Sequence, residues 1–172
     1  DGALACVREF EEMACVVVKH ANPCGVAIGN DLLGVYKRAF NADSLSAFGG
    51  IIAFNRVCTK EVAKAISKVF VEIVLAPSFE PEALEIFKKK KNLRVLEIGE
   101  FGKREKKVEV RNIDGGLLVQ DTDTKILTKD DLTTVTKREP SEKEIETALF
   151  TWKVLRHTKS NGILIAKSDT TV

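Results

Sequence analysis

Hydrophobic and polar positions form short alternating blocks over the first hundred residues, and these blocks predict strands and helices in turn. Apolar runs predict strands at residues 14–19, 51–54, 73–76 and 93–98. A helical spacing that ends near Glu11 precedes the first strand, and further helices are expected after Asp31, after Thr59 and from Pro81. Alternation of this kind is typical of an α/β sheet with helices on its faces.

The pattern changes after Gly99. Apolar residues at alternate positions predict extended segments on both sides of a turn at residues 114–116, and residues 120–139 read as a polar loop or surface arm. Ser141 and Glu144 form a capping box that starts another helix, and a last strand is expected at residues 162–166. The sequence therefore predicts a single α/β unit with a β-rich excursion.

Composition narrows the class of protein. The chain has 172 residues, and its 27 basic side chains nearly balance 25 acidic ones, so a dedicated nucleic-acid binder is not expected. No apolar run is long enough to cross a membrane and no signal peptide is visible. The four dispersed cysteines are interpreted as reduced thiols of a cytoplasmic protein. Because the chain begins at Asp1, we expect it to be a piece of a longer polypeptide.

The sequence VVVKHANPCG, residues 16–25, carries the strongest candidate chemistry. The valines predict a buried strand that brings Lys19 and His20 to its carboxyl end, the edge where ligands usually bind in open α/β sheets. Pro23 predicts a break into a loop, and Gly25 permits a tight turn. The alternative is that Lys19 merely enters solvent and His20 caps a loop; residue types alone leave both interpretations open.

Other positions have weaker signals. SAFGG at residues 46–50 is a glycine-rich turn that lets a ligand approach the backbone, although most glycine pairs are only turns. Glu72 is by its type a surface carboxylate, and His157 is expected to be a helix-end residue. The polar segment at 158–161 fits ordinary turn chemistry. The lysines at 88–91 are expected to be a solvated helix end, with a phosphate site as the alternative.

KHANPCG at 19–25, SAFGG at 46–50 and KSN at 159–161 together resemble the family of bifunctional purine-biosynthesis enzymes. These enzymes combine aminoimidazole carboxamide ribonucleotide (AICAR) formyltransferase with inosinate cyclohydrolase. The resemblance covers nearly the whole chain and the first part of the transformylase half. It implies that residues 1–172 form the first three-layer α/β/α, cytidine-deaminase-like unit of that half. By the same resemblance, we expect the cyclohydrolase domain and the second unit to lie outside these 172 residues.

The implied reaction is formyl transfer from 10-formyltetrahydrofolate to the 5-amino group of AICAR. By resemblance His20 is the proton acceptor and Lys19 stabilises the transition state, roles that suit an imidazole and an ammonium group. The resemblance also assigns nucleotide binding to four residues: Asn22, Gly49, Glu72 and Asn161. In some family members a potassium ion binds near the positions of Thr158 and Ser160; this chain departs from their pattern at Gly162, where some relatives carry serine.

The resemblance further implies a homodimer with its active sites at the interface, binding small molecules rather than nucleic acid or a membrane. Parts of the nucleotide and folate sites are missing from the 172 residues, among them an upstream Arg-Tyr pair and a downstream arginine. We therefore expect this chain by itself to be inactive in formyl transfer.

Two alternatives belong to other functional classes. A deaminase-like nucleobase hydrolase would need zinc ligands, but no second cysteine follows Cys24 at the required spacing and Asn22, not glutamate, stands two places after His20. We therefore expect no zinc. A non-catalytic binding or assembly domain would keep the fold without the chemistry, and the intact Lys19-His20 pair argues against it.

Overall fold

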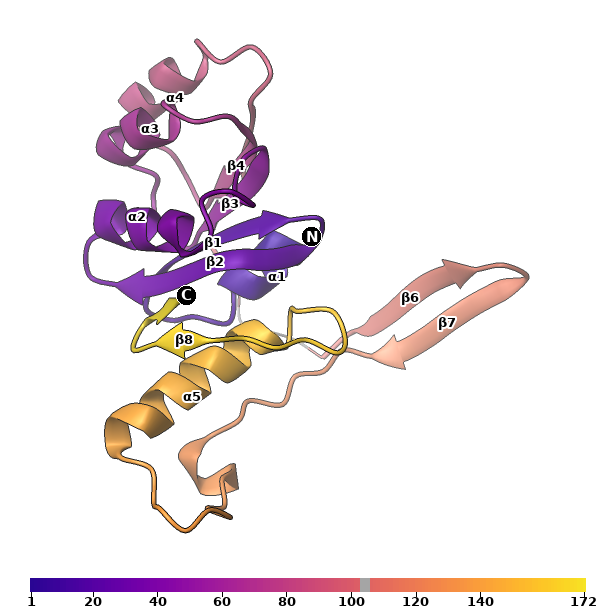
Figure 1. Ribbon diagram of the computed structural model, residues 1–172. Helices are drawn as coiled ribbons and strands as arrows, with labels where there is room; N and C mark the ends of the chain where they lie inside the picture. The colour runs from indigo at the N-terminus through magenta and orange to yellow at the C-terminus, as the bar shows by residue number, and fades with distance from the viewer. Residues whose placement is uncertain (103–105) are drawn as a thin grey trace.

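The computed structural model describes residues 1–102 and 106–172 and has three layers, with one mixed sheet between two sets of helices (Figure 1). The sheet has seven strands in the order β5-β4-β3-β1-β2-β9-β8. Their bounds are β1 Met13–Lys19, β2 Asn22–Gly29, β3 Gly50–Phe54, β4 Val71–Ala76, β5 Arg94–Glu97, β8 Ala166–Lys167 and β9 Thr170–Thr171. Strands β3, β4 and β5 are parallel, whereas β1 is antiparallel to both of its neighbours.

Each face of the sheet carries its own hydrophobic core. The helices are α1 Gly2–Val7, α2 Leu32–Ala42, α3 Lys60–Ile66, α4 Pro81–Phe87 and α5 Glu142–Leu155. Helices α2, α3 and α4 pack on one face with Val17, and α1 and α5 pack on the other with Val16. Successive side chains of a strand point to opposite faces, so the valine run of β1 is buried on both. The predicted three-layer α/β/α architecture is confirmed.

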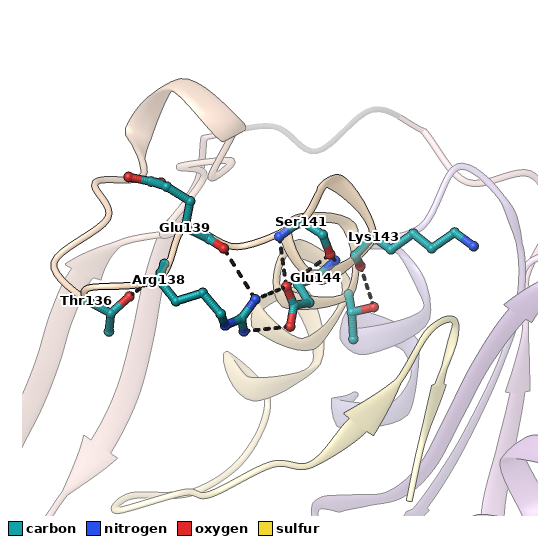
Figure 2. A network of polar contacts seen from close by, with 7 residues as sticks. Thr136, Arg138, Glu139, Ser141, Lys143 and Glu144 are labelled. Carbon is teal, nitrogen blue, oxygen red and sulfur yellow. Dashed lines mark hydrogen bonds and ion pairs between the residues drawn. The ribbon is translucent and has the colours of Figure 1, made fainter.

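The helix starts expected from the sequence are also confirmed. The Asp31 carboxylate accepts hydrogen bonds from the backbone N–H groups of Leu33 and Gly34 at the start of α2. The Thr59 hydroxyl accepts one from Val62 in α3. At α5 the capping box of Ser141 and Glu144 is complete (Figure 2). These side chains satisfy N–H groups that have no partner within the first helical turn.

The stretch at residues 22–25 was expected to be a loop, and this prediction is wrong. His20 and Ala21, with φ of 50° and 65°, reverse the chain so that β2 begins at Asn22 and pairs with β1. Pro23 is tolerated there because it lies at a register shift, where a strand can lose one ladder hydrogen bond. Gly25 serves helix packing rather than a turn, since a Cβ at this position would lie 1.8 Å from the Ala39 carbonyl oxygen.

The hairpin changes the edge of the sheet at which Lys19 lies. Because β1 runs antiparallel to β3, its carboxyl end lies beside the amino ends of β3 and β4. The candidate chemistry is therefore at the amino edge of the parallel strands, not at the carboxyl edge that the sequence pattern suggested.

Two further boundaries differ from expectation. Helix α1 ends at Val7, before Glu11. The strand predicted at residues 162–166 is reduced to β8, because residues 162–165 belong to no strand; Ile163 in this segment is 88% exposed.

The β-rich excursion is confirmed as a hairpin of β6 Val108–Ile113 and β7 Gly116–Asp121, which extends away from the sheet (Figure 1). Residues 103–105 of the predicted excursion lie outside the described residues. The polar arm that follows is irregular apart from a short 3₁₀ helix, η1 Lys129–Asp131. None of the helices in the described ranges has the length and apolar character that a membrane crossing requires.

Candidate functional site

Lys19 and Gly49 form the centre of the candidate site. The Lys19 ammonium group, at the end of β1, donates a hydrogen bond of 2.8 Å to the Gly49 carbonyl oxygen just before β3. Gly49 has a φ of +66°, and a Cβ there would lie 2.9 Å from Lys19 Nζ and 3.2 Å from the Phe70 ring. The SAFGG motif is thus hydrogen-bonded to the KHANPCG motif. Only glycine fits position 49 without backbone strain or displacement of Lys19 and Phe70.

The turn that holds Gly49 has two further supports. The Gly49 N–H donates to the Phe70 carbonyl oxygen at 2.9 Å, which fastens the turn to the residue before β4. The Asp43 carboxylate accepts from the Ser46 backbone N–H at 2.9 Å, and hydrogen bonds from Ser46 lower the Asp43 pKa below its ordinary value. Sequence reasoning missed Asp43, although an aspartate three residues before Ser46 is a recognisable turn signal.

His20 occupies the turn between β1 and β2 and is exposed. Within the described residues its side chain has no hydrogen-bond partner, so its ring nitrogens are available to a ligand. A positive φ is uncommon for residues other than glycine, and the hairpin imposes it on both His20 and Ala21. The hairpin thus fixes the backbone of His20 directly after Lys19, at the end of β1.

Asn22 connects this hairpin to the third motif. Its side-chain oxygen accepts a hydrogen bond of 3.0 Å from the backbone N–H of Lys159, which lies 137 residues away in sequence. The exposed residues Ser160 and Asn161 follow directly. The Thr158 hydroxyl oxygen is buried and has no hydrogen-bond partner in the described part of the chain.

Glu72 lies at the same edge but stays apart from the other candidates. In β4 it is the extra residue at a register shift, since Gly50 pairs with Val71 and Ile51 pairs with Ile73. Its side chain is exposed, and in the described ranges it makes no polar contact with Lys19 or Asn22. The structure thus joins Lys19, Gly49 and Asn22 with the 158–161 segment, and places Glu72 nearby.

The cysteines are unreactive in this arrangement. All four are free thiols, as the sequence predicted. Cys24 is the one nearest the site, and burial, with a contribution from the Asp43 charge, raises the pKa of its thiol to about 11. A thiol with such a pKa stays protonated near neutral pH and is a poor nucleophile or metal ligand.

The other histidine is structural. His157 Nε2 lies 2.8 Å from a carboxylate oxygen of Glu9, so the expectation of a helix-end residue agrees with its place just after α5. In the described residues there is no group of three or more histidine, cysteine or acidic side chains that could hold a metal ion.

Comparison with known proteins connects this chain to a family. Among solved structures, Acinetobacter baumannii RibD, form 2, is 16% identical with a TM-score of 0.40, and the match covers 55% of this chain and 31% of that one. The chain thus spans less than a third of that protein's length. The family model described as AICARFT/IMPCHase bienzyme matches residues 1–172. The chain therefore belongs to the AICARFT/IMPCHase bienzyme family, an enzyme family of purine biosynthesis.

Proposed function

We propose that the chain carries the Lys-His part of a site that transfers a formyl group from 10-formyltetrahydrofolate to the 5-amino group of AICAR. One observation carries the proposal: three motifs distant in sequence meet at one edge of the sheet, through the contacts of Lys19 with Gly49 and of Asn22 with Lys159. Membership of a purine-biosynthesis family supports the same conclusion.

His20 acts as the base in this proposal. The amino nitrogen of AICAR attacks the formyl carbon, the new C–N bond forms, and the imidazole accepts the proton that the nitrogen loses. The exposed ring can meet an incoming nucleotide directly. Collapse of the intermediate then breaks the bond between the formyl carbon and the folate nitrogen, which leaves with a proton.

Lys19 stabilises the negative charge that develops on the formyl oxygen. Its ammonium group donates to the Gly49 carbonyl at 2.8 Å, which fixes its position, and it has further N–H donors for the oxyanion. A donor that is already in place needs no reorganisation when the charge develops. The same group can also protonate the departing folate nitrogen.

The nucleotide is held by the residues around this pair. We assign Gly49 a backbone contact, and Glu72 and Asn161 polar contacts to AICAR. Asn22 keeps the 158–161 segment in place through Lys159 and retains its amide N–H groups for substrate. The buried, unpartnered Thr158 hydroxyl fits one ligand of a potassium ion, with Ser160 as a second candidate. Such an ion would order the segment, and no step of the reaction requires it.

The test is the loss of turnover when the imidazole is removed. The assay uses the full-length bienzyme, because the expected dimer and folate site involve segments outside this chain. His20→Ala should lower turnover by roughly 10²–10⁴-fold, the usual value of general acid–base catalysis. The affinity for AICAR, measured by calorimetry, should change much less. Steady-state formyl transfer with saturating substrates gives the turnover number.

Two variants separate chemistry from backbone geometry. His20→Asn keeps a residue that tolerates a positive φ but cannot act as the base, so it should be as inactive as His20→Ala. Lys19→Met should lower turnover by about 10²–10³-fold because the oxyanion loses a donor. Lys19→Arg should restore little of this turnover. Near-normal turnover of His20→Asn would show that His20 only shapes the turn, and the proposal would fail.

A further inference from the structure

A cavity of about 340 Å³ opens between the carboxyl ends of α3 and α4, next to the candidate site. Lys68 lines it from the α3 side, and residues 89–91, all lysines, line it from the α4 side. Phe70 forms part of its wall, and the backbone of Phe70 is bonded to Gly49. The cavity therefore adjoins the turn that positions Lys19.

The charge in this lysine pocket is compensated only in part, by the Glu85 carboxylate, whose pKa is lowered chiefly by Lys88 and to a lesser extent by Lys89. Its four lysines make no ion pair within the described residues, and no carboxylate is found among the lining residues, all of which belong to the described part of the chain. Lys88, just outside, does pair with Glu85. Each helix end contributes about half a negative charge. Two ends thus offset about one of the four positive charges and leave an excess of about three.

The four lysines of the pocket are exposed, and they line a hollow that the two helix ends share. The helix dipole accounts for a cation after each helix taken alone, whereas here the lysines that follow α3 and α4 line one cavity. The walls include apolar groups from Val69, Phe70 and Leu93, together with the polar residues Ser67 and Asn92. The volume lies at the small end of the range for ligand sites, roughly 300–1,000 Å³.

We propose that the lysine pocket binds a small polyvalent anion, one that carries at least two phosphate or carboxylate groups. Two anionic groups can reach the ammonium groups of both helix ends at once, whereas a monovalent ion satisfies only one side. The site is separate from the Lys19-His20 pair and uses neither residue. Its occupancy consequently does not depend on whether the chain takes part in formyl transfer.

Calorimetric titration of the purified 172-residue chain tests the proposal, with inorganic pyrophosphate in one arm and citrate in the other. We expect binding of one anion per chain that weakens as salt is added. The variant Lys89→Gln, Lys90→Gln, Lys91→Gln should bind roughly ten- to a hundredfold more weakly, since each exposed ion pair is worth up to about fivefold. Lys68→Gln should lower the affinity for the anion about two- to fivefold.

The matched control replaces three exposed lysines elsewhere with glutamine, at positions Lys137, Lys143 and Lys167. It changes the net charge equally and should bind each anion as the unmodified chain does. Tighter binding of pyrophosphate would identify a phosphorylated ligand, and tighter binding of citrate a polycarboxylate; either result supports the proposal. Absence of binding in both arms, or an equal loss in the control, would overturn it, and circular dichroism verifies that each variant is folded.

Discussion

At the residue scale, the position of Lys19 depends on a glycine that has no room for a side chain. Gly49→Ala places a methyl group 2.9 Å from Lys19 Nζ and forces alanine into a left-handed conformation that costs about 1–2 kcal/mol. Within the proposed reaction, we expect turnover in the full-length enzyme to fall at least tenfold, because a displaced ammonium group stabilises the oxyanion poorly. Chemical denaturation measures the loss of stability, and steady-state kinetics measure the loss of turnover.

Gly115→Ala is the control for this prediction. Gly115 has a φ of +77°, and a Cβ there would meet nothing within 4 Å. Its replacement should lower stability by about the same 1–2 kcal/mol while leaving turnover unchanged. An equal loss of turnover in both variants would attribute the effect at Gly49 to backbone strain alone.

At the scale of elements, α5 begins at a network that responds to pH (Figure 2). Hydrogen bonds from Arg138, followed by those from Ser141, lower the pKa of Glu144 from 4.5 to about 2. A carboxyl group whose pKa is lower in the folded state adds stability above its unfolded pKa, and this stability is lost as pH falls through the folded pKa. The contribution of Glu144 is thus full above pH 4.5 and declines toward pH 2.

Glu144→Gln should therefore be less stable than the unmodified chain at pH 6, and the difference should shrink as pH falls from 4.5 toward 2. Urea unfolding at several pH values measures it. Because Arg138 is the leading cause of the low pKa, Arg138→Gln should weaken the same pH dependence. A stability difference that stays constant across this range would contradict the assignment.

At the scale of the whole molecule, one arginine joins α5 to two distant segments. Arg156, only 13% exposed, pairs with the buried Glu9 carboxylate after α1 at 3.4 Å. It also donates to the backbone carbonyls of Lys125 and Asp123 in the arm that follows the β6–β7 hairpin. His157 contacts the other Glu9 oxygen. The network ties the end of α5 to the arm that follows the hairpin and to the segment between α1 and β1.

Arg156→Met should lower the free energy of unfolding by about 1–3 kcal/mol, because it removes one cation from the Glu9 carboxylate and takes the donor from two backbone carbonyls. Hydrogen exchange of the amides around Asp123 and Lys125 should accelerate, since their anchor is lost. Arg111→Met, at an exposed position of β6, is the matched control and should cost less than about 0.5 kcal/mol. Unchanged exchange in the arm would show that other contacts hold it.

Local sequence signals were enough to predict most helices and strands and the burial of the first strand. The valine run predicted a strand covered on both faces, and Asp31, Thr59 and Ser141 marked helix starts, because these signals act over a few residues. The buried Asn55 was missed. Its side chain accepts from the Ala14 backbone and donates to backbone carbonyls near α1, partners 41 to 45 residues away that no local pattern reveals.

Only the tertiary structure decided how the candidate site is assembled. The local preference of proline predicted a break in the chain at Pro23, whereas pairing with β1 makes this residue part of β2. The resulting hairpin places the site at the amino edge of the parallel strands. Gly25 was read as a turn residue because the closeness of α2 cannot be seen in the sequence. The bond from Lys159 to Asn22 spans 137 residues, and such contacts form only after the sheet has brought both segments together.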